Sequence, residues 1–499
     1  MQGFEPAFAG LERRAFIVDL NNFSTFPTLA VGLLVAALRR EKIETEVLCP
    51  LNLGVKTIPR EHRDTLADHL ARRLHHASWR PYLQARDTAR AIRARWKSRT
   101  DPVVLSGVIE ALDRRPGVVL LSSYLQHHET VREIAAQAAA RGIPVVLGGP
   151  AFNMVEVSDA WRDLPGLTAI VGGEADLSLP AFLRALWNGD DLLAFDGVLL
   201  PDGRRSRPAP PLRGLDRIPV PDFTDFPWDR YPDRVIPVMT GRGCQWSKCL
   251  FCNDIATASG RTFRTRPPEA VLEELRILAD RHGAKRFIFL DLKLNSHPGM
   301  FRAIVDGIQT AVPGAEWIGT VHVDQRRDNG LTRPELERAV ASGMRRISFG
   351  FESGSQRMLD AMEKGSSVAS NATFVRDAHA VGLSVRATMF KGFPGETAID
   401  LLQTAEFLEE NGPYMDRVRY NDFTVAMDTP LYATLKANPQ AYADLEVIGA
   451  TPLNGRAVYR NRGNVDRIYQ RVNNRVLRAV YEINRRPIRA AASAFDGLM

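Results

Sequence analysis

The chain has 499 residues, of which 45% are hydrophobic and 25% charged, which is typical of a globular protein of about two to four domains. This composition excludes a disordered or fibrous chain, and four cysteines are too few to staple so many residues with disulfides. The 65 Lys and Arg exceed the 58 Asp and Glu by seven. We interpret the excess as ordinary surface charge, including the arginine-rich stretch from Arg456 to Arg489, so we do not expect a nucleic-acid partner.

The first residues of the chain do not resemble a signal peptide. Met1 to Glu12 includes acidic residues and lacks an apolar core. No run elsewhere approaches the ~18 apolar residues that cross a bilayer. We therefore expect a cytoplasmic protein without membrane contact, in which clustered cysteines hold metal more often than disulfides.

The first part of the chain alternates short apolar runs with helical patterns. The predicted strands are 14–20, 45–49, 117–122, 144–149 and 167–173, and the predicted helices are 28–40, 129–141 and 177–187. A stretch rich in Arg, His and Ala at about 56–114 interrupts this order and is interpreted as a helical insertion. The alternation predicts an α/β fold, with a doubly wound, Rossmann-like sheet over residues 1–201.

Such a sheet binds ligands at the carboxyl ends of its strands. Small residues and one acid stand there in this sequence: Ser122, Ser123, Gly148, Gly149, Gly172, Gly173 and Glu174. Glycine allows a ligand to approach the backbone closely, although a plain strand-ending turn uses glycine for the same reason. Each glycine pair is therefore weak evidence when taken alone.

A second run of strands and helices follows a linker rich in Pro, Asp and Arg at 202–230. The predicted strands are 236–240, 286–291, 317–323, 345–351, 384–390 and 417–425, with helices at 268–282, 334–342, 370–381 and 398–410. A complete barrel of such units needs eight of them and about 250 residues. The pattern therefore predicts a partial, six-stranded barrel over 231–437, followed by a C-terminal extension at 438–499.

Three of the four cysteines stand directly after the first strand of the predicted barrel: Cys244, Cys249 and Cys252. Three thiolates on one loop can ligate three irons of a [4Fe–4S] cluster and leave the fourth iron open. Structural zinc usually takes four ligands, and no fourth Cys or His is close in the sequence. The spacing thus favours an iron–sulfur cluster over zinc or inert core cysteines, and Cys49 is expected to be a packing residue.

The cysteine loop and its surroundings resemble the radical S-adenosylmethionine (SAM) superfamily. The spacing of four and then two residues departs from the three and two that are usual there. Segments similar to the family's motifs follow in order, at 241–243, 287–291, 349–355, 390–396 and 429–432. The resemblance covers about residues 235–435.

This resemblance implies a set of SAM-contacting residues: Phe251, Asp291, Glu352, Ser353, Arg386 and Lys391. Phe251 matches the aromatic position that family members place against the adenine. Several of these residues have ordinary alternatives. Glu352 can cap a helix, Lys391 can be solvated, and Arg386 can form a structural ion pair instead of binding the SAM carboxylate.

The first part of the chain resembles the cobalamin-binding domain of cobalamin-dependent radical SAM enzymes. Residues 27–34 are similar to the first helix of that domain, and 121–123, 148–149 and 172–174 to its later loops. The sequence lacks the Asp-x-His-x-x-Gly motif that supplies a histidine to cobalt. We therefore expect cobalamin without a histidine ligand, with Tyr124, Gln126 or Asn21 near the cobalt.

In such enzymes the reduced cluster cleaves SAM to a 5′-deoxyadenosyl radical, and methylcobalamin donates a methyl group to the substrate radical. The resemblance implies a methyltransferase that acts on an unactivated carbon of a peptide or small natural product, with a reductant such as flavodoxin or ferredoxin. A peptide is suggested by residues 244–246 and 392–396, which look somewhat like radical SAM proteins of peptide maturation. The alternatives are a non-methylating cyclase or rearrangement enzyme, and a non-catalytic cobalamin or iron–sulfur sensor.

Overall fold

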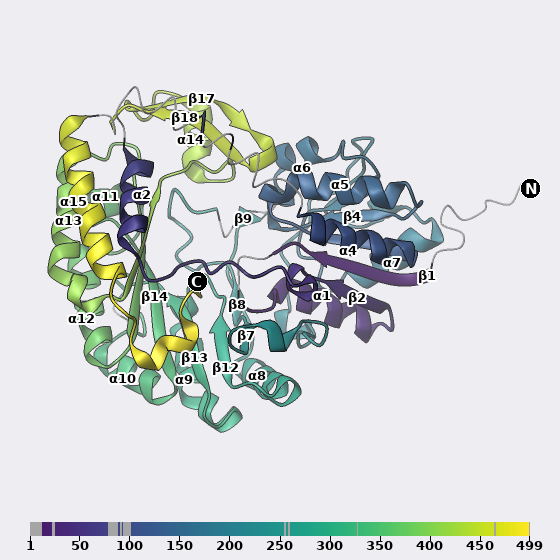
Figure 1. The fold of residues 1–499 in the computed structure, drawn as a ribbon, viewed down its shortest axis with the longest axis horizontal. Coiled ribbons are helices and arrows are strands. Elements are labelled where there is room, and N and C mark those ends of the chain that lie inside the picture. The colour runs from purple at the N-terminus through teal and green to yellow at the C-terminus, as the bar shows by residue number, and fades with distance from the viewer. Residues whose placement is uncertain are drawn as a thin grey trace, which may run out of the picture.

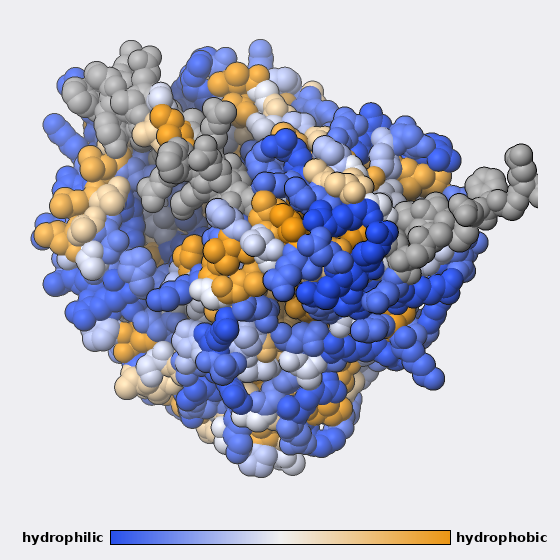
Figure 2. All heavy atoms as spheres, turned by 45° about the vertical axis from the view of Figure 1, so that its right-hand side comes forward, coloured by the Kyte–Doolittle hydropathy of each residue, from blue (hydrophilic) through white to orange (hydrophobic). Residues whose placement is uncertain are grey.

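The computed structural model describes residues 12–21, 25–77, 88–89, 92, 101–253, 256–257, 260–326, 328–463 and 466–498. Two six-stranded sheets, each lined with helices, lie next to each other (Figure 1). The face in Figure 2 is mostly hydrophilic, with hydrophobic groups scattered in small patches. None of the helices in the described ranges is long and apolar enough to cross a membrane.

The N-terminal sheet has the strand order β2-β1-β3-β4-β5-β6, and it is parallel except for β6. Its strands are β1 Glu12–Asp19, β2 Glu44–Leu48, β3 Pro116–Ser122, β4 Val145–Gly148, β5 Leu167–Val171 and β6 Val198–Leu199. The first five were predicted from their apolar runs, because a strand covered on both faces is almost continuously hydrophobic. The short antiparallel β6 lies in the region that we assigned to the end of this sheet and was not predicted as a strand.

Helices cover both faces of this sheet. They are α1 Leu29–Arg40, α7 Leu179–Asn188, α4 Pro102–Asp113, α5 His128–Ala139 and α6 Val155–Trp161. Alternate residues of β1 enter different cores, since Ala15 and Ile17 pack with α1 and α7, whereas Phe16 and Val18 pack with α4 and α5. The sheet is therefore doubly wound, as the alternating pattern predicts.

The second sheet is entirely parallel, with the order β16-β15-β14-β13-β12-β7. Its strands are β7 Val235–Val238, β12 Arg286–Phe289, β13 Glu316–Val321, β14 Met344–Glu352, β15 Ser384–Lys391 and β16 Arg417–Asp422. Its helices are α8 Pro268–His282, α9 Pro298–Ala311, α10 Arg333–Ala341, α11 Gln356–Ala361, α12 Val368–Ala380 and α13 Ala398–Asn411. The strand pairings of the described residues do not join β16 to β7, so this sheet stays open.

Short ribbons flank the loop after β7. β8 Gly241–Arg242 pairs with β11 Arg264–Thr265, and β9 Ala256–Thr257 pairs with β10 Gly260–Arg261. β8 precedes the cysteine loop and β11 follows it, so the chain leaves β7, passes through β8, forms the loop and returns along β11 before it enters α8.

The C-terminal extension, for which the sequence predicts no definite structure, connects both sheets. It follows α14 Pro430–Ala437 and contains a hairpin of β17 Leu445–Thr451 and β18 Arg456–Asn461, then α15 Arg467–Asn484. The side chain of Asn484 in α15 pairs with both backbone groups of Val418 in β16, at 2.8 and 2.9 Å. Trp161 Nε1 of α6 donates a hydrogen bond to the carbonyl oxygen of Leu453 in the loop of the hairpin.

The predicted insertion crosses from the first sheet to the second. Its helix α2 Leu66–His76 lies beside α15 (Figure 1), where the rings of His69 and Tyr481 stack at 4.7 Å. Most of the following stretch, up to residue 100, lies outside the described residues.

Candidate active site

The three clustered cysteines lie on the loop that follows β7 and β8, at the carboxyl end of the second sheet. Cys244 and Cys249 are buried, Cys252 is half-buried, and none of the three is part of a disulfide among the described residues. The backbone amide of Cys252 donates to the carbonyl of Cys249 at 3.3 Å, which closes a tight turn. The loop therefore presents three thiols from one short segment.

Asp291 fastens the chain just before this loop. Its buried carboxylate accepts hydrogen bonds from the amide and hydroxyl of Thr240 and from the amide of Gly241, at 2.7 to 3.1 Å. Burial raises the pKa of Asp291 to about 6, although these hydrogen bonds oppose the shift. The predicted SAM-lining residue is thus engaged by protein groups, and it positions the loop.

A second anchor joins the loop to the segment after β14. Trp246 Nε1 donates to Glu363 O at 2.7 Å, and Leu250 N donates to Met362 O at 3.1 Å. Gly365 adopts a φ of +69°, and a Cβ there would lie 2.2 Å from the Trp246 ring. The tryptophan of the Cys-Gln-Trp sequence therefore docks against a glycine that no larger residue can replace.

Two lysines that the sequence analysis missed place positive charge beside the thiols. Lys364 interacts electrostatically with Cys249 and Cys252, and Lys293 interacts with Cys244 and Cys249. Burial raises the pKa of the Cys249 thiol, whereas the two lysines lower it. Burial and the charge of Lys364 lower the pKa of Lys293 to about 8. A signal was available for Lys293, since it stands two residues after Asp291.

Two predicted SAM-contacting residues gather around these lysines. Glu352, the last residue of β14, forms a buried ion pair with Lys364, with 2.8 Å between Oε1 and Nζ. Its φ of +60° is a strained, left-handed conformation of the kind that clusters at functional sites. Phe251 packs edge-on against Phe390 at 5.0 Å, and Lys364 Nζ lies 5.7 Å from the Phe251 ring centre. Phe251 and Glu352 thus lie next to the cysteines.

The other predicted SAM-contacting residues have partners elsewhere. Ser353 Oγ lies 3.3 Å from Thr404 Oγ1, and Lys391 Nζ lies 2.8 Å from Asp422 Oδ1. Arg386 requires a correction. It is the third residue of β15, about 16 Å along the strand from the carboxyl end, and it is paired with Glu61 at 2.8 Å. Arg386 is buried, and its position supports a structural ion pair and not a contact with a ligand at the carboxyl end of the sheet.

The predicted ligand positions of the N-terminal sheet lie at or just after the carboxyl ends of three strands: Ser122 and Ser123 of β3, Gly148 and Gly149 of β4, and Gly172 and Gly173 of β5. Protein packing already requires three of these glycines. An added Cβ would lie 2.8 Å from Ser123 O at Gly149, 2.3 Å from Phe152 O at Gly172, and 2.6 Å from Ala209 at Gly173. Gly148 is less restricted, with its nearest neighbour at 3.4 Å.

Glu174 also requires a correction, because its carboxylate binds protein groups. It forms hydrogen bonds with both terminal nitrogens of Arg264, at 2.5 and 2.9 Å, and accepts from Leu212 N at 2.6 Å. Nearby, Asp176 binds both terminal nitrogens of Arg242 at 2.8 Å. The two acids therefore hold the strands that flank the cysteine loop against the N-terminal sheet, and Glu174 is not directed at a ligand.

Asp19 is a candidate that the sequence analysis missed. It ends β1, next to the place where the strand order reverses between β2 and β3, and such places bind ligands. The residue is buried, and its Oδ2 has no hydrogen-bond partner among the described residues. Burial raises the pKa of Asp19 to about 6, although the hydrogen bonds from Thr28 and Asn21 oppose this shift. Asn21, predicted to approach the cobalt, donates to Thr28 Oγ1 at 3.1 Å.

Comparison with known proteins agrees with these observations. Residues 238–408 match the model of the radical SAM superfamily. An uncharacterized methyltransferase of Pyrococcus horikoshii, PH0819, is 30% identical over 277 residues, which are 54% of this chain and 57% of that protein. The anaerobic magnesium-protoporphyrin IX monomethyl ester cyclase of Rubrivivax gelatinosus is 28% identical over 267 residues, 51% of this chain and 47% of that protein. The chain thus spans about half the length of these curated relatives.

A solved structure is similar over nearly the whole chain. It is the radical SAM methyltransferase TsrM of Kitasatospora setae with cobalamin and a [4Fe–4S] cluster bound, at a TM-score of 0.64 and 15% identity. The match covers 97% of this chain and 90% of that one, and at this identity it establishes the fold. The segment that carries Cys244, Cys249 and Cys252 thus matches the radical SAM superfamily, and the whole chain has the fold of the TsrM structure.

Proposed function

We propose that this protein is a cobalamin-dependent radical SAM methyltransferase. The observation that carries the proposal is the loop of three clustered cysteines with two lysines beside it, in a segment that matches the radical SAM superfamily. The donor set fits a [4Fe–4S] cluster, because thiolates are the usual ligands of such clusters and the lysines offset their negative charge.

The residues around the loop support this use. Cys244, Cys249 and Cys252 would hold the cluster, which would supply the electron for SAM cleavage, and cobalamin would supply methyl-transfer chemistry. Asp291 and Trp246 fix the loop from two sides. Phe251 offers an aromatic face next to the thiols for the adenine, and Lys293 offers a positive charge for a carboxylate.

The N-terminal sheet is the proposed cobalamin domain, at residues 1–201. At the carboxyl edge of this sheet, Asp19 Oδ2 has no hydrogen-bond partner among the described residues, and the backbone at Gly148 is less closely packed than at the other three glycines. Both features fit a large polar ligand. Cobalamin bound there needs no histidine ligand from this chain. The linker is assigned to 202–230, the radical SAM domain to 231–437 and the extension to 438–499.

The proposed substrate is a peptide or small natural product, methylated at an unactivated carbon, with flavodoxin or ferredoxin as reductant. A second candidate function is cyclisation without methyl transfer, which the similarity to the Rubrivivax gelatinosus protein favours.

The test is anaerobic reconstitution with iron, sulfide and cobalamin, followed by SAM and reductant. We expect iron–sulfur absorbance and 5′-deoxyadenosine from the parent protein, and neither from Cys249→Ala. S-adenosylhomocysteine formed alongside would indicate methylation, and deoxyadenosine alone would favour cyclisation.

Cys49→Ala is the matched control, because Cys49 is a buried core thiol whose Sγ lies 2.8 Å from Asn52 Oδ1 in the N-terminal sheet. This variant should keep the cluster. If Cys249→Ala keeps both the absorbance and SAM cleavage, or the loaded parent cleaves no SAM, the proposal is wrong.

A further inference from the structure

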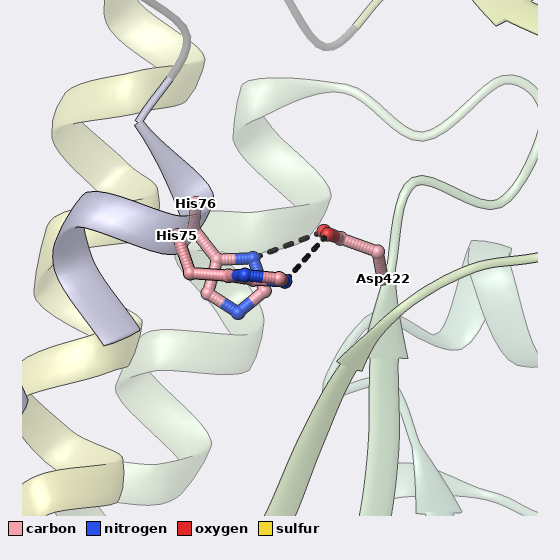
Figure 3. Close-up of side chains that lie close together, drawn as sticks. All are labelled: His75, His76 and Asp422. Carbon is pink, nitrogen blue, oxygen red and sulfur yellow. Dashed lines mark hydrogen bonds and ion pairs between the residues drawn. The ribbon is translucent and has the colours of Figure 1, made fainter. Parts of the chain in front are cut away.

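Two histidines and an aspartate meet at the rim of the second sheet. His75 and His76 end helix α2, and Asp422 is the last residue of β16. Figure 3 shows the three side chains pointing toward one another. Asp422 Oδ1 lies 3.0 Å from His76 Nδ1, Oδ2 lies 3.8 Å from His75 Nε2, and one ligand atom from each residue falls within 4.8 Å of the others.

These separations fit the ligands of one small ion. Zinc binds histidine nitrogen and carboxylate oxygen at about 2.0–2.2 Å, so neighbouring ligands of a tetrahedral site lie about 3.3 Å apart. The two separations run to different oxygens of Asp422, at 3.0 Å from Oδ1 to His76 and 3.8 Å from Oδ2 to His75. The carboxylate and the His75 side chain must therefore both adjust to give one ion three ligands at this spacing.

Asp422 supplies the acidic ligand of the cluster, and its side chain is 40% exposed. Both histidines also lie in the last turn of α2, where the unpaired carbonyls of a helix favour positive charge.

One of the two imidazoles is buried and the other is exposed, which suits a metal site with one open coordination position. The side chain of His76 is 3% exposed and packs against Tyr420, with 5.5 Å between ring centres. The side chain of His75 is 54% exposed, so the cluster faces solvent on that side. Water or an oxygen or nitrogen donor of another molecule can reach a fourth corner there.

Lys391 is the feature that opposes a cation, since its Nζ lies 2.8 Å from Asp422 Oδ1. A carboxylate can ligate through one oxygen while the other accepts a hydrogen bond, which is a common arrangement around protein-bound metals. The lysine should therefore weaken metal binding without preventing it.

We propose that His75, His76 and Asp422 form a binding site for a divalent transition-metal ion of the zinc type, with its fourth position open to solvent. The three ligands are distinct from the cysteines, because Asp422 ends β16 and the two histidines belong to α2, whereas the cysteine loop follows β8. The ion would fasten the insertion helix α2 to the rim of the sheet. The inference does not depend on the proposed enzymatic function.

The test is equilibrium dialysis of the cluster-reconstituted full chain against Zn²⁺, with zinc and iron measured in the same samples. We expect one zinc per chain in addition to the cluster. His75→Ala should bind zinc at least about 10-fold more weakly with unchanged iron, because a lost ligand costs at least as much as a lost outer partner. Lys391→Met should bind zinc more tightly, since it removes the competing charge.

His62→Ala is the matched control, because His62 is also an exposed histidine of this segment but pairs with Asp68 outside the cluster. It should bind zinc like the parent. Equal zinc binding by His75→Ala and the parent, or no gain in Lys391→Met, would show that the cluster is a hydrogen-bonded brace and not a metal site.

Discussion

Arg386 and Glu61 form a buried ion pair of 2.8 Å although they are 325 positions apart in the chain. Glu61 also binds Arg346, at 2.5 Å, so one carboxylate from the insertion serves two guanidinium groups inside the second sheet. Arg346 is completely buried and donates as well to the backbone carbonyl of Phe495 at 3.1 Å. The insertion and the C-terminus therefore meet at arginines of β14 and β15.

Replacing Glu61 with glutamine should lower the free energy of unfolding by about 3 kcal/mol, because it leaves two buried guanidinium groups without a counter-charge. Urea unfolding of the full chain measures this. The control is Glu273→Gln on α8, where the pair with Arg276 is exposed and its loss should cost much less stability. Equal effects of the two changes would contradict the role of Glu61.

Asp291→Asn should reduce the iron retained by the cysteine loop. The amide keeps one acceptor oxygen but turns an NH₂ group toward the donors of Thr240 and Gly241, so the chain before Cys244 loses its anchor. Iron per chain after reconstitution and desalting is the measurement. Asp280→Asn, at an exposed position on α8, should retain the parental iron content. Full iron retention in Asp291→Asn would show that the loop needs no such anchor.

Glu396 should make stability depend on pH. Its buried Oε2 accepts from Gly392 N at 2.6 Å and from the Tyr469 hydroxyl at 2.5 Å, and burial raises its pKa from 4.5 to about 7. The folded state thus holds a proton that the unfolded state releases near pH 4.5. This contribution is complete below that pH and is lost as pH rises through about 7, at a total of about 3 kcal/mol.

Glu396→Gln has no such proton, so the fall in its unfolding free energy between pH 5 and 8 should be smaller than in the parent. Glu406→Gln, at an exposed position of α13, the helix that begins just after Glu396, should follow the parent. Parallel pH profiles for Glu396→Gln and the parent would rule out this titration.

Local patterns in the sequence predict most strands of both sheets and the position of the cysteine loop. Apolar runs such as 117–122 specify buried strands through their own composition, and the cysteine spacing is a local feature. The partners of Arg386 and Glu174 could not be predicted in this way, because an ion pair depends on which distant segments meet. The arginine-rich stretch near the C-terminus was interpreted as plain surface, yet α15 buries Tyr469 and Leu477 on one face. Its arginines lie mostly on the other face. The number of charged residues in this stretch therefore did not reveal that the helix is amphipathic.

Glu174→Ala should loosen the linker between the two sheets. The carboxylate holds Leu212 N at 2.6 Å and Arg264 on β11, and the next residue, Arg213, is an exposed trypsin site. Without the carboxylate, the backbone at Leu212 loses its acceptor, and local opening at the linker should cost less free energy. Tryptic cleavage after Arg213 in the folded protein should therefore become faster. Glu133→Ala, at an exposed position of α5, is the matched control and should be cleaved at the parental rate. Equal rates for both variants would show that other contacts hold the linker, since the carboxylate would then make no difference to its opening.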